Sequence, residues 1–569
     1  MSKLVNALIL GFLTGLLQGF IDTYGYAVTG YTTAEIAGVV AAIMYLILYK
    51  LIFRKSPTPV EHFIGSLIAS GIAISTTITA GMYITYTMLH ELGDVSSLRI
   101  PSWAYHNSYL SIETIAFFTY ATSISVSGSI IAYVFYKHFV EKEKLAYPIG
   151  SSIARVIQLG KALKREYVLI TVLGGAAIQL ISSLTGGFSV DPTPQLQTIL
   201  PGSSIALSMD IFVLLLALLI PLNTSVGVGI GNVVTYFVIT PILTTLGLMI
   251  SLPTMDSKAL ATAASPLISS LISGFLIVFS SYYIIVSRRY LISTFRYVYI
   301  SKYLLRYVLM ALALMITAVV PVLLLTDLPL TALLAIPLII LLQFFLTILT
   351  ARVAGEVGTV SQATLPVATL TLFASGARGA IPYIFLDPYT GVPMPQFFAA
   401  NTLNYVKAGK VLDVRAEVST FIPALFAVLG APITLIYGYI LISVFGLNSP
   451  KLNLLRWVPV VTWMNNLYKG DISAFNTYTV LIGALFAIAF IFLMKFLGLS
   501  GVSFFGILIG ATLTPDLGLL FIVASLIKYV AYRIGVDVYE SLITYASLAL
   551  AGAGLGVALS VTLSLIGVA

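Results

Sequence analysis

The sequence predicts an all-α polytopic membrane protein with about 14 to 16 transmembrane helices in two pseudo-repeated halves. Hydrophobic residues make up 59% of the 569 residues, charged residues make up only 9%, and the mean hydropathy is +1.03. Soluble domains carry about 25% charged residues. Apolar runs of about twenty residues, the length that crosses a bilayer, recur along the whole chain. No polar segment is long enough to form a separate soluble domain.

Eight apolar runs fill the first half of the chain, and a less regular set fills the second. Those of the first half are Leu4–Ile21, Ala34–Phe53, Glu61–Leu89, Ile112–His138, Tyr167–Gly186, Ile205–Ile220, Val226–Ile250 and Ser265–Val286. Those of the second half are Tyr303–Thr326, Leu328–Arg352, Glu356–Ser375, Phe421–Phe445, Tyr478–Leu497, Phe504–Leu513, Leu517–Val530 and Leu542–Ile566. Met394–Val406 is too short and too polar for an ordinary span, and Ala380–Pro395 resembles an outer loop or a broken helix. The first run lacks a cleavage site, so we expect a span and not a signal peptide.

The distribution of basic residues predicts the orientation. Up to Arg306 there are eighteen Lys and Arg, and sixteen of them fall at the N-terminus or in loops on its side of the membrane. Only Arg99 and Lys258 fall on the other side. Because cytoplasmic loops are enriched in Lys and Arg, we expect a cytoplasmic N-terminus and a location in the cell (plasma) membrane. The net charge of +8 therefore reflects topology and not nucleic-acid binding.

A weak internal repeat divides the chain near its middle. The stretch Pro221–Gly227 resembles Thr512–Gly518, and each follows one short apolar run and precedes another. The paired runs of Leu4–Phe53 likewise resemble Tyr307–Thr350. We therefore predict an N-terminal transmembrane half, residues 1–290, and a C-terminal one, residues 291–569. Transporters built from repeats bind their substrate near mid-membrane, where interrupted helices meet.

A charge pair follows one of the most apolar runs. In Ala351–Gly358, Arg352 and Glu356 are four residues apart and share a face if the helix continues. Gly355 leaves room for another backbone to approach. A charge at mid-bilayer costs about 2.5–3.5 kcal/mol, so one interpretation is a substrate or proton site. The other is a helix end at the membrane face, with Arg352 in water, and the spacing does not choose between them.

Further polar candidates lie at predicted helix ends. In Glu143–Ala154, Pro148 can open a helix whose N-terminus, with Tyr147, Gly150 and Ser151, could hold an anionic group, although an ordinary loop and helix start also fits. The acids Asp22, Glu61, Glu113 and Asp210 lie in or at the ends of spans and are candidates for proton coupling. Asn223 lies in the predicted helix break at residues 221–225.

Several classes of chemistry lack support. The chain has no cysteine, which excludes disulfides and thiol chemistry. The four histidines do not cluster, and neither an HExxH motif nor a phosphate-binding GxxxxGK[ST] loop occurs. The glycine-rich run Gly227–Gly231 lies inside a span, where helix packing explains it. We therefore expect no cofactor, no bound metal and no ATP-driven transport.

Four stretches resemble the oligopeptide transporter (OPT) family, which includes the plant yellow stripe-like metal-chelate transporters. They are the opening pair of spans in Asn6–Leu51, Lys144–Ala154 for the Lys-Leu-x-[Tyr/Phe]-Pro-x-Gly motif, Ala351–Gly358 for Ala-Arg-x-Ala-Gly-Glu-Thr-Gly, and Lys407–Gly409 for Lys-Thr-Gly. Their order and spacing also fit, and the resemblance covers nearly the whole chain. The chain departs from the family at Ser152, at Ala408, and where an acid would precede Lys407.

The resemblance implies proton-coupled secondary transport of small oligopeptides or peptide-like metal chelates, and not an enzyme. The substrate-binding residues expected from the motifs are Arg352, Glu356, Tyr147, Pro148, Gly150, Ser151, Asn223 and Lys407. The proton-coupling residues expected are Glu356, Asp210 and Glu61, with Glu356 the first choice. An intramembrane lipid-modifying enzyme and a passive channel remain alternatives. The sequence leaves open whether the chain forms a homo-oligomer.

Overall fold

The computed structural model shows a chain that is helical almost throughout its described part, in agreement with the predicted all-α class. The exception is a small antiparallel pair of strands, β1 (Ser189–Val190) and β2 (Leu207–Ser208), in which Ser189 pairs with Ser208. The structure describes residues 2–29, 37–92, 112–162, 165–184, 189–220, 222–261, 302–357, 367–386, 395–445, 465–471, 476–496, 506–507, 510–511 and 513–565, and short pieces between 263 and 285.

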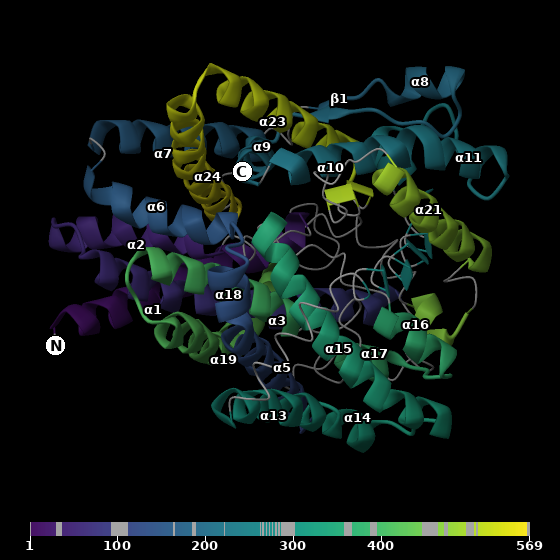
Figure 1. Ribbon diagram of the computed structural model, residues 1–569, viewed down its shortest axis with the longest axis horizontal. Coiled ribbons are helices and arrows are strands. Elements are labelled where there is room, and N and C mark those ends of the chain that lie inside the picture. Colours follow the sequence, from purple (N-terminus) through teal and green to yellow (C-terminus); the bar gives the residue numbers. More distant parts are fainter. Residues whose placement is uncertain are drawn as a thin grey trace. The chain divides into compact units, whose positions relative to one another are not determined.

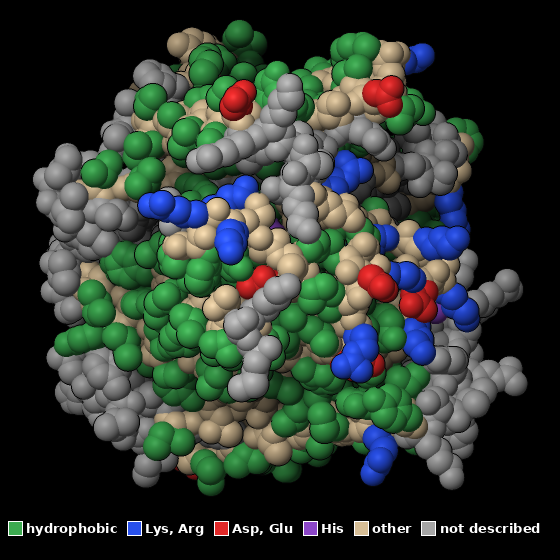
Figure 2. Space-filling view, turned by 90° about the vertical axis from the view of Figure 1, so that its left-hand side faces the viewer, with side chains coloured by type: hydrophobic (Ala, Val, Ile, Leu, Met, Phe, Trp, Pro, Cys, Tyr) green, Lys and Arg blue, Asp and Glu red, His purple; other side chains and the backbone are tan. Residues whose placement is uncertain are grey.

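Helices long and apolar enough to cross a membrane run through this part of the chain. Within the described residues there are six: Phe117–Lys142, Leu222–Thr245, Tyr303–Leu325, Leu330–Arg352, Ala416–Ile442 and Pro515–Ile534. On the face shown in Figure 2, most of the described side chains are hydrophobic and the charged ones are few. Apolar side chains outside and apolar helices of this length are typical of an integral membrane protein.

The chain forms two compact units, each built from separate segments. Unit 1 comprises Met1–Leu163, Arg289–Val360 and Thr364–Ala474, and unit 2 comprises Lys164–Arg288, Ser361–Ala363 and Phe475–Ala569. Both units therefore draw residues from each side of residue 290. The division into halves at that residue concerns the repeat and stays a prediction.

Unit 1 holds most of the predicted motifs. Its elements are α1 (Ser2–Thr29), α2 (Ala37–Phe53), α3 (Pro59–Leu92), α5 (Ile112–Tyr136), the π-helical turn η3 (Lys137–Lys142), α6 (Pro148–Ala162), α13 (Lys302–Thr317), α14 (Val320–Leu325), α15 (Leu330–Val357), α16 (Val367–Ala374), α17 (Ala380–Leu386), α18 (Pro395–Val411) and α19 (Ala416–Phe445). Helix α18 packs against α5, α6, α15 and α19 (Figure 1), and all of its residues from Pro395 to Val406 are buried. The segment that seemed too polar for a span is thus an interior helix, in which Asn401, Thr402 and Asn404 form hydrogen bonds within the protein.

Unit 2 holds the predicted helix breaks. Its elements are α7 (Arg165–Leu184), β1, α8 (Thr193–Ile199), β2, α9 (Ile211–Leu219), α10 (Leu222–Val234), η4 (Thr235–Ile239), α11 (Thr240–Thr245), α21 (Thr477–Phe496), α23 (Pro515–Ile534) and α24 (Val536–Leu565). A Cβ added to Gly231 of α10 would lie 2.0 Å from the carbonyl oxygen of Ile507, and one added to Gly510 would lie 1.9 Å from that of Val228. The glycine-rich run therefore serves helix packing, as the sequence indicated.

Several predicted boundaries differ from the observed ones. Helix α1 continues to Thr29, seven residues beyond Asp22, so that acid lies inside a helix and not at its end. The span predicted over Ile205–Ile220 is only the short helix α9, preceded by strand β2, which places Asp210 just before the helix. The span predicted over Tyr303–Thr326 agrees with the candidate span Tyr303–Leu325, within which the α-helix is interrupted between α13 and α14, next to Pro321.

Candidate functional site

Three sequence motifs, far apart in the chain, meet in unit 1. They are the end of η3 with the start of α6, the C-terminal turns of α15, and the second half of α18. The Tyr147 hydroxyl donates to the Ala351 carbonyl at 2.9 Å, Gly150 N–H donates to Asn404 Oδ1 at 3.0 Å, and Lys407 Nζ donates to the Leu145 carbonyl at 3.1 Å. The sequence analysis selected each stretch separately as a candidate binding motif, and in the fold they contact one another.

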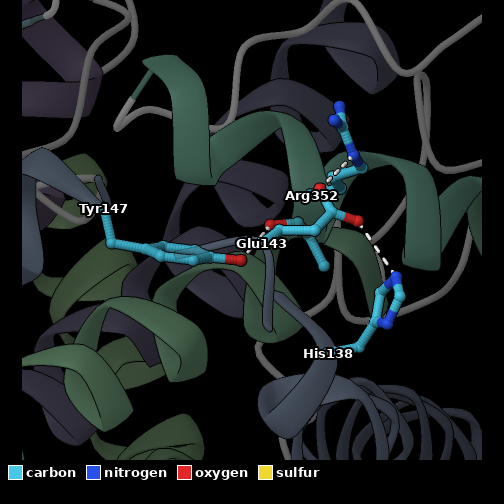
Figure 3. Close-up of polar contacts among 5 residues, drawn as sticks. His138, Glu143, Tyr147 and Arg352 are labelled. Atoms are coloured by element: carbon cyan, nitrogen blue, oxygen red, sulfur yellow. Dashed lines mark hydrogen bonds and ion pairs between the residues drawn. The ribbon is translucent and has the colours of Figure 1, made fainter. Parts of the chain in front are cut away.

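The charged centre of this cluster is Glu143. Its Oε2 accepts from Arg352 Nε at 2.9 Å, and its Oε1 lies 3.0 Å from His138 Nε2. Figure 3 shows the carboxylate between the two partners. The side chains of Glu143, Arg352 and His138 are 14%, 25% and 10% exposed, so bulk water does not surround them. Arg352 therefore lies near the end of α15 and is bound to Glu143, and its role in a substrate or proton site stays a prediction.

Helix α15 does continue through Glu356, which gives Arg352 and Glu356 the i, i+4 spacing that the sequence suggested. The Glu356 side chain lies outside the described residues. The acid that binds Arg352 is Glu143, which comes 209 residues earlier in the chain. Local spacing could not indicate this partner, because the pairing depends on how η3 and α15 pack.

Tyr147 connects the motif to α15 in an unusual backbone conformation. Its φ is +43°, in the left-handed region that costs a residue with a Cβ about 1–3 kcal/mol. The conformation is held at both ends of the residue, since Tyr147 N–H donates to the Gly355 carbonyl at 2.9 Å and the ring is fully buried. A Cβ added to Gly355 would lie 2.7 Å from Leu145 Cδ1 and 2.9 Å from Tyr147 Cζ. Gly355 is therefore required for this approach, as expected.

The start of α6 is less open to an anion than its sequence suggests. Pro148 begins the helix, Ser151 N–H donates to the Tyr147 carbonyl, and the Ser151 hydroxyl donates to the Ala146 carbonyl at 3.0 Å. The Gly150 N–H, one of the donors that an anion would need, is already bound to Asn404. An anionic ligand at this N-terminus would have to displace the Asn404 side chain.

The other predicted residues lie elsewhere, at or near the starts of helices. Glu61 and Thr58 exchange bonds of 3.4 Å between side chain and backbone at the start of α3, in unit 1. Glu61 is 5% exposed, and its Oε1 has no hydrogen-bond partner. In unit 2, Asp210 accepts from Val213 N–H at 3.2 Å and Asn223 from Thr224 N–H at 3.0 Å. Capping accounts for the positions of Glu61 and Asp210, whereas Asn223 lies within α10.

Sequence reasoning gave too little weight to some polar residues. Glu143, His138 and Asn404 complete the cluster, and Asp22 is 1% exposed within α1. The available signal was the length of the first helix, which would have placed Asp22 inside it. Among the described residues, no group of three or more His, Asp or Glu side chains is placed to hold a metal ion.

The charge of Glu143 predicts how the stability of unit 1 depends on pH. Burial alone would raise the pKa of Glu143, but the hydrogen bond with His138 and the charge of Arg352 outweigh it and keep that pKa below its ordinary value. A lowered pKa stabilises the fold above the unfolded pKa of about 4.3, and this stabilisation is lost as the pH falls through the folded pKa. We expect the wild type to exceed Glu143→Gln in unfolding free energy at pH 7 and the gap to close below about pH 4. Chemical unfolding in detergent micelles from pH 7 to 3 measures this gap, and a constant gap would contradict the prediction.

Comparison with known proteins adds no assignment. No family model matches the chain, and no curated protein matches it. The resemblance to the OPT family therefore rests on the motifs quoted above and stays a prediction.

Proposed function

We propose that this protein is a proton-coupled secondary transporter that imports small oligopeptides or peptide-like metal chelates across the cell membrane. Its chain would cross the bilayer about 14 to 16 times in two pseudo-repeated halves, with the N-terminus in the cytoplasm. The proposal is supported by the apolar helices and by the charge asymmetry of the loops. The motif resemblance supplies the class of substrate.

The observation that carries the proposal is the meeting of the three motifs around Glu143 and Arg352. The stretches 143–154 and 351–358 and the residue Lys407 were selected from the sequence, and residues of all three contact one another in one place together with Asn404. Charged and polar groups gathered at the ends of apolar helices are typical of solute and proton pathways.

We assign a role in transport to each of three residues, Arg352, Lys407 and Glu356. Arg352 would release Glu143 to bind a substrate carboxylate, since a guanidinium binds carboxylates in a fixed fork geometry. Lys407 donates to the Leu145 carbonyl, two residues after Glu143, and could bind the same anionic group. Glu356, one turn beyond Arg352, would exchange the coupling proton. The Glu143–Arg352 pair then describes the state in which no substrate is bound.

Uptake into proteoliposomes with an imposed pH gradient tests the proposal. The chain should concentrate radiolabelled di- to hexapeptides or iron chelates when the outside is acidic, and accumulation should stop when an ionophore collapses the gradient. Glu356→Gln should abolish the gradient-driven part and leave exchange of internal for external substrate intact.

Each alternative gives a different result. Substrate that only equilibrates, with or without a gradient, would indicate a passive channel. Conversion of a lipid without solute accumulation would indicate an enzyme. Gradient-driven uptake that survives in Glu356→Gln would remove the coupling role from that residue and leave the transport proposal standing.

A further inference from the structure

Unit 2 contains a buried lysine that bonds to no acidic side chain among the described residues. Lys528 lies in the apolar helix Pro515–Ile534 and is fully buried. Its Nζ donates to the Ala217 carbonyl at 2.8 Å and to the Ile220 carbonyl at 2.6 Å. Ala217 lies in the last turn of α9 and Ile220 directly follows that helix. The helical structure is interrupted there, before α10 begins at Leu222. The end of a helix leaves its last carbonyls without intrahelical partners and carries partial negative charge, so an ammonium group is favoured there.

Among the described residues, the groups bound to Lys528 Nζ are backbone carbonyls and no acidic side chain, while the side chain of Glu540 on α24 lies outside the described residues. Helix α23 packs against α9, α10, α24 and β2. The sequences of α9, α10 and β2 contain no ionisable residue. On α24, the described ionisable residues Asp537 and Tyr545 are exposed, and Tyr539 is half-buried. The Ser225 hydroxyl of α10 bonds to the same Ala217 carbonyl and donates to the Phe521 carbonyl at 3.1 Å.

A second interruption between helices in unit 2 shows that its free carbonyls can be bound by a side chain without a charge. Before α23 begins at Pro515, the carbonyls of Gly510, Leu513 and Thr514 accept from Asn232 Nδ2 of α10 at 3.0, 3.0 and 3.3 Å. A neutral amide thus ties α10 to that break, in the same way that Lys528 ties α23 to the break after α9. A buried ammonium costs far more to desolvate than an amide, so its presence at one break of two indicates a use for the charge.

We propose that Lys528 is a proton-binding site that controls the break between α9 and α10. While protonated, the ammonium holds the α9 carbonyls. When the proton leaves Nζ for water, the neutral amine that remains makes weaker hydrogen bonds and no longer offsets the negative end of α9. The break is then released and Ser225 becomes accessible. This inference deepens the proposed function, because it names a residue of unit 2 that binds the coupling ion, a proton.

Cysteine labelling tests the site without any substrate, since the natural chain contains no cysteine. Ser225→Cys places a thiol at a position that is fully buried in this structure. Thr198→Cys, on the exposed face of α8, reports how the reactivity of a thiol itself changes with pH. The ratio of the two labelling rates with a small maleimide should be flat at low pH. It should then rise by up to about tenfold per pH unit where Lys528 loses its proton.

Two further variants fix the cause of the rise. Ser225→Cys with Lys528→Arg should stay poorly labelled at every pH, because arginine keeps its charge. Ser225→Cys with Lys528→Met should be labelled readily at every pH. If the ratio of labelling rates for Ser225→Cys alone stays flat between pH 5 and 9, the inference is overturned, even if neither double variant folds. The same rise in the arginine variant also overturns it. A flat labelling ratio removes only the role of Lys528, whereas absence of gradient-driven uptake removes the proposed function, so the two failures are distinguishable.

Discussion

Arg352→Ala is expected to lower the free energy of unfolding by about 2–3 kcal/mol and to reduce gradient-driven uptake by about tenfold or more. Removal of the guanidinium leaves the Glu143 carboxylate, only 14% exposed, without its cationic partner. The penalty comes mainly from that unpaired charge and less from the lost attraction. Chemical unfolding in detergent micelles measures the first effect, and proteoliposome uptake measures the second.

The same region offers a matched control. Lys410 Nζ lies 3.3 Å from Glu141 Oε1, and the two side chains are 52% and 43% exposed. This exposed pair joins α18 to η3. Lys410→Ala should lower the free energy of unfolding by no more than about 0.5 kcal/mol. The double variant Glu143→Gln with Arg352→Gln should recover part of the loss, because neither charge is then stranded. Equal losses in Arg352→Ala and Lys410→Ala would show that burial does not matter at this pair.

Gly175→Val is expected to destabilise unit 2 by about 3 kcal/mol, whereas Gly174→Val should change little. A Cβ on Gly175 of α7 would lie 2.3 Å from the Ala549 carbonyl oxygen of α24, while nothing lies within 4 Å of one on Gly174. The two helices approach at backbone distance, because Gly552 and Gly556 of α24 face the Val172 and Ala176 carbonyls of α7 in the same way. Both substitutions carry the same cost of a β-branched residue in a helix, so their difference isolates the contact.

Thermal unfolding of the purified protein in detergent, with the retained monodisperse fraction as a second readout, compares the two variants. The two positions lie on the same helix and at nearly the same distance from its ends, so they differ mainly in what the added side chain would contact. Similar melting temperatures for the two valine variants would mean that α7 and α24 do not pack as described.

The sequence predicted the class of fold and several local features because these depend on nearby residues. Composition and run length identify apolar helices, Pro148 opens α6, and Gly355 leaves room for a close approach. Helix ends were less accurate. Asp22 seemed to end a span because polar residues follow it, but α1 continues to Thr29. A polar residue ends an apolar run without ending a helix.

The site could be predicted only in part, because its key pairings join distant segments. Arg352 was selected correctly as a residue with unusual surroundings, yet its partner Glu143 could not be inferred from spacing. Asn404 was noted only as a neighbour of a missing acid, and it instead binds the Gly150 N–H. Lys528 is a basic residue near the C-terminal end of the predicted apolar run Leu517–Val530. Its carbonyl partners, about 310 residues away in the chain, appear only in the folded structure.

The interleaving of the two units constrains how the ribosome delivers this protein to the membrane. Unit 1 begins with residues 1–163, but the next piece it needs starts at Arg289. At ordinary synthesis rates the first helices wait about 6 to 25 seconds while part of unit 2 is made. During that interval η3 has been synthesised and α15 has not, so Glu143 cannot yet pair with Arg352. Insertion factors or lipid headgroups would have to shelter the nascent chain, and neither unit can be produced alone as one uninterrupted fragment.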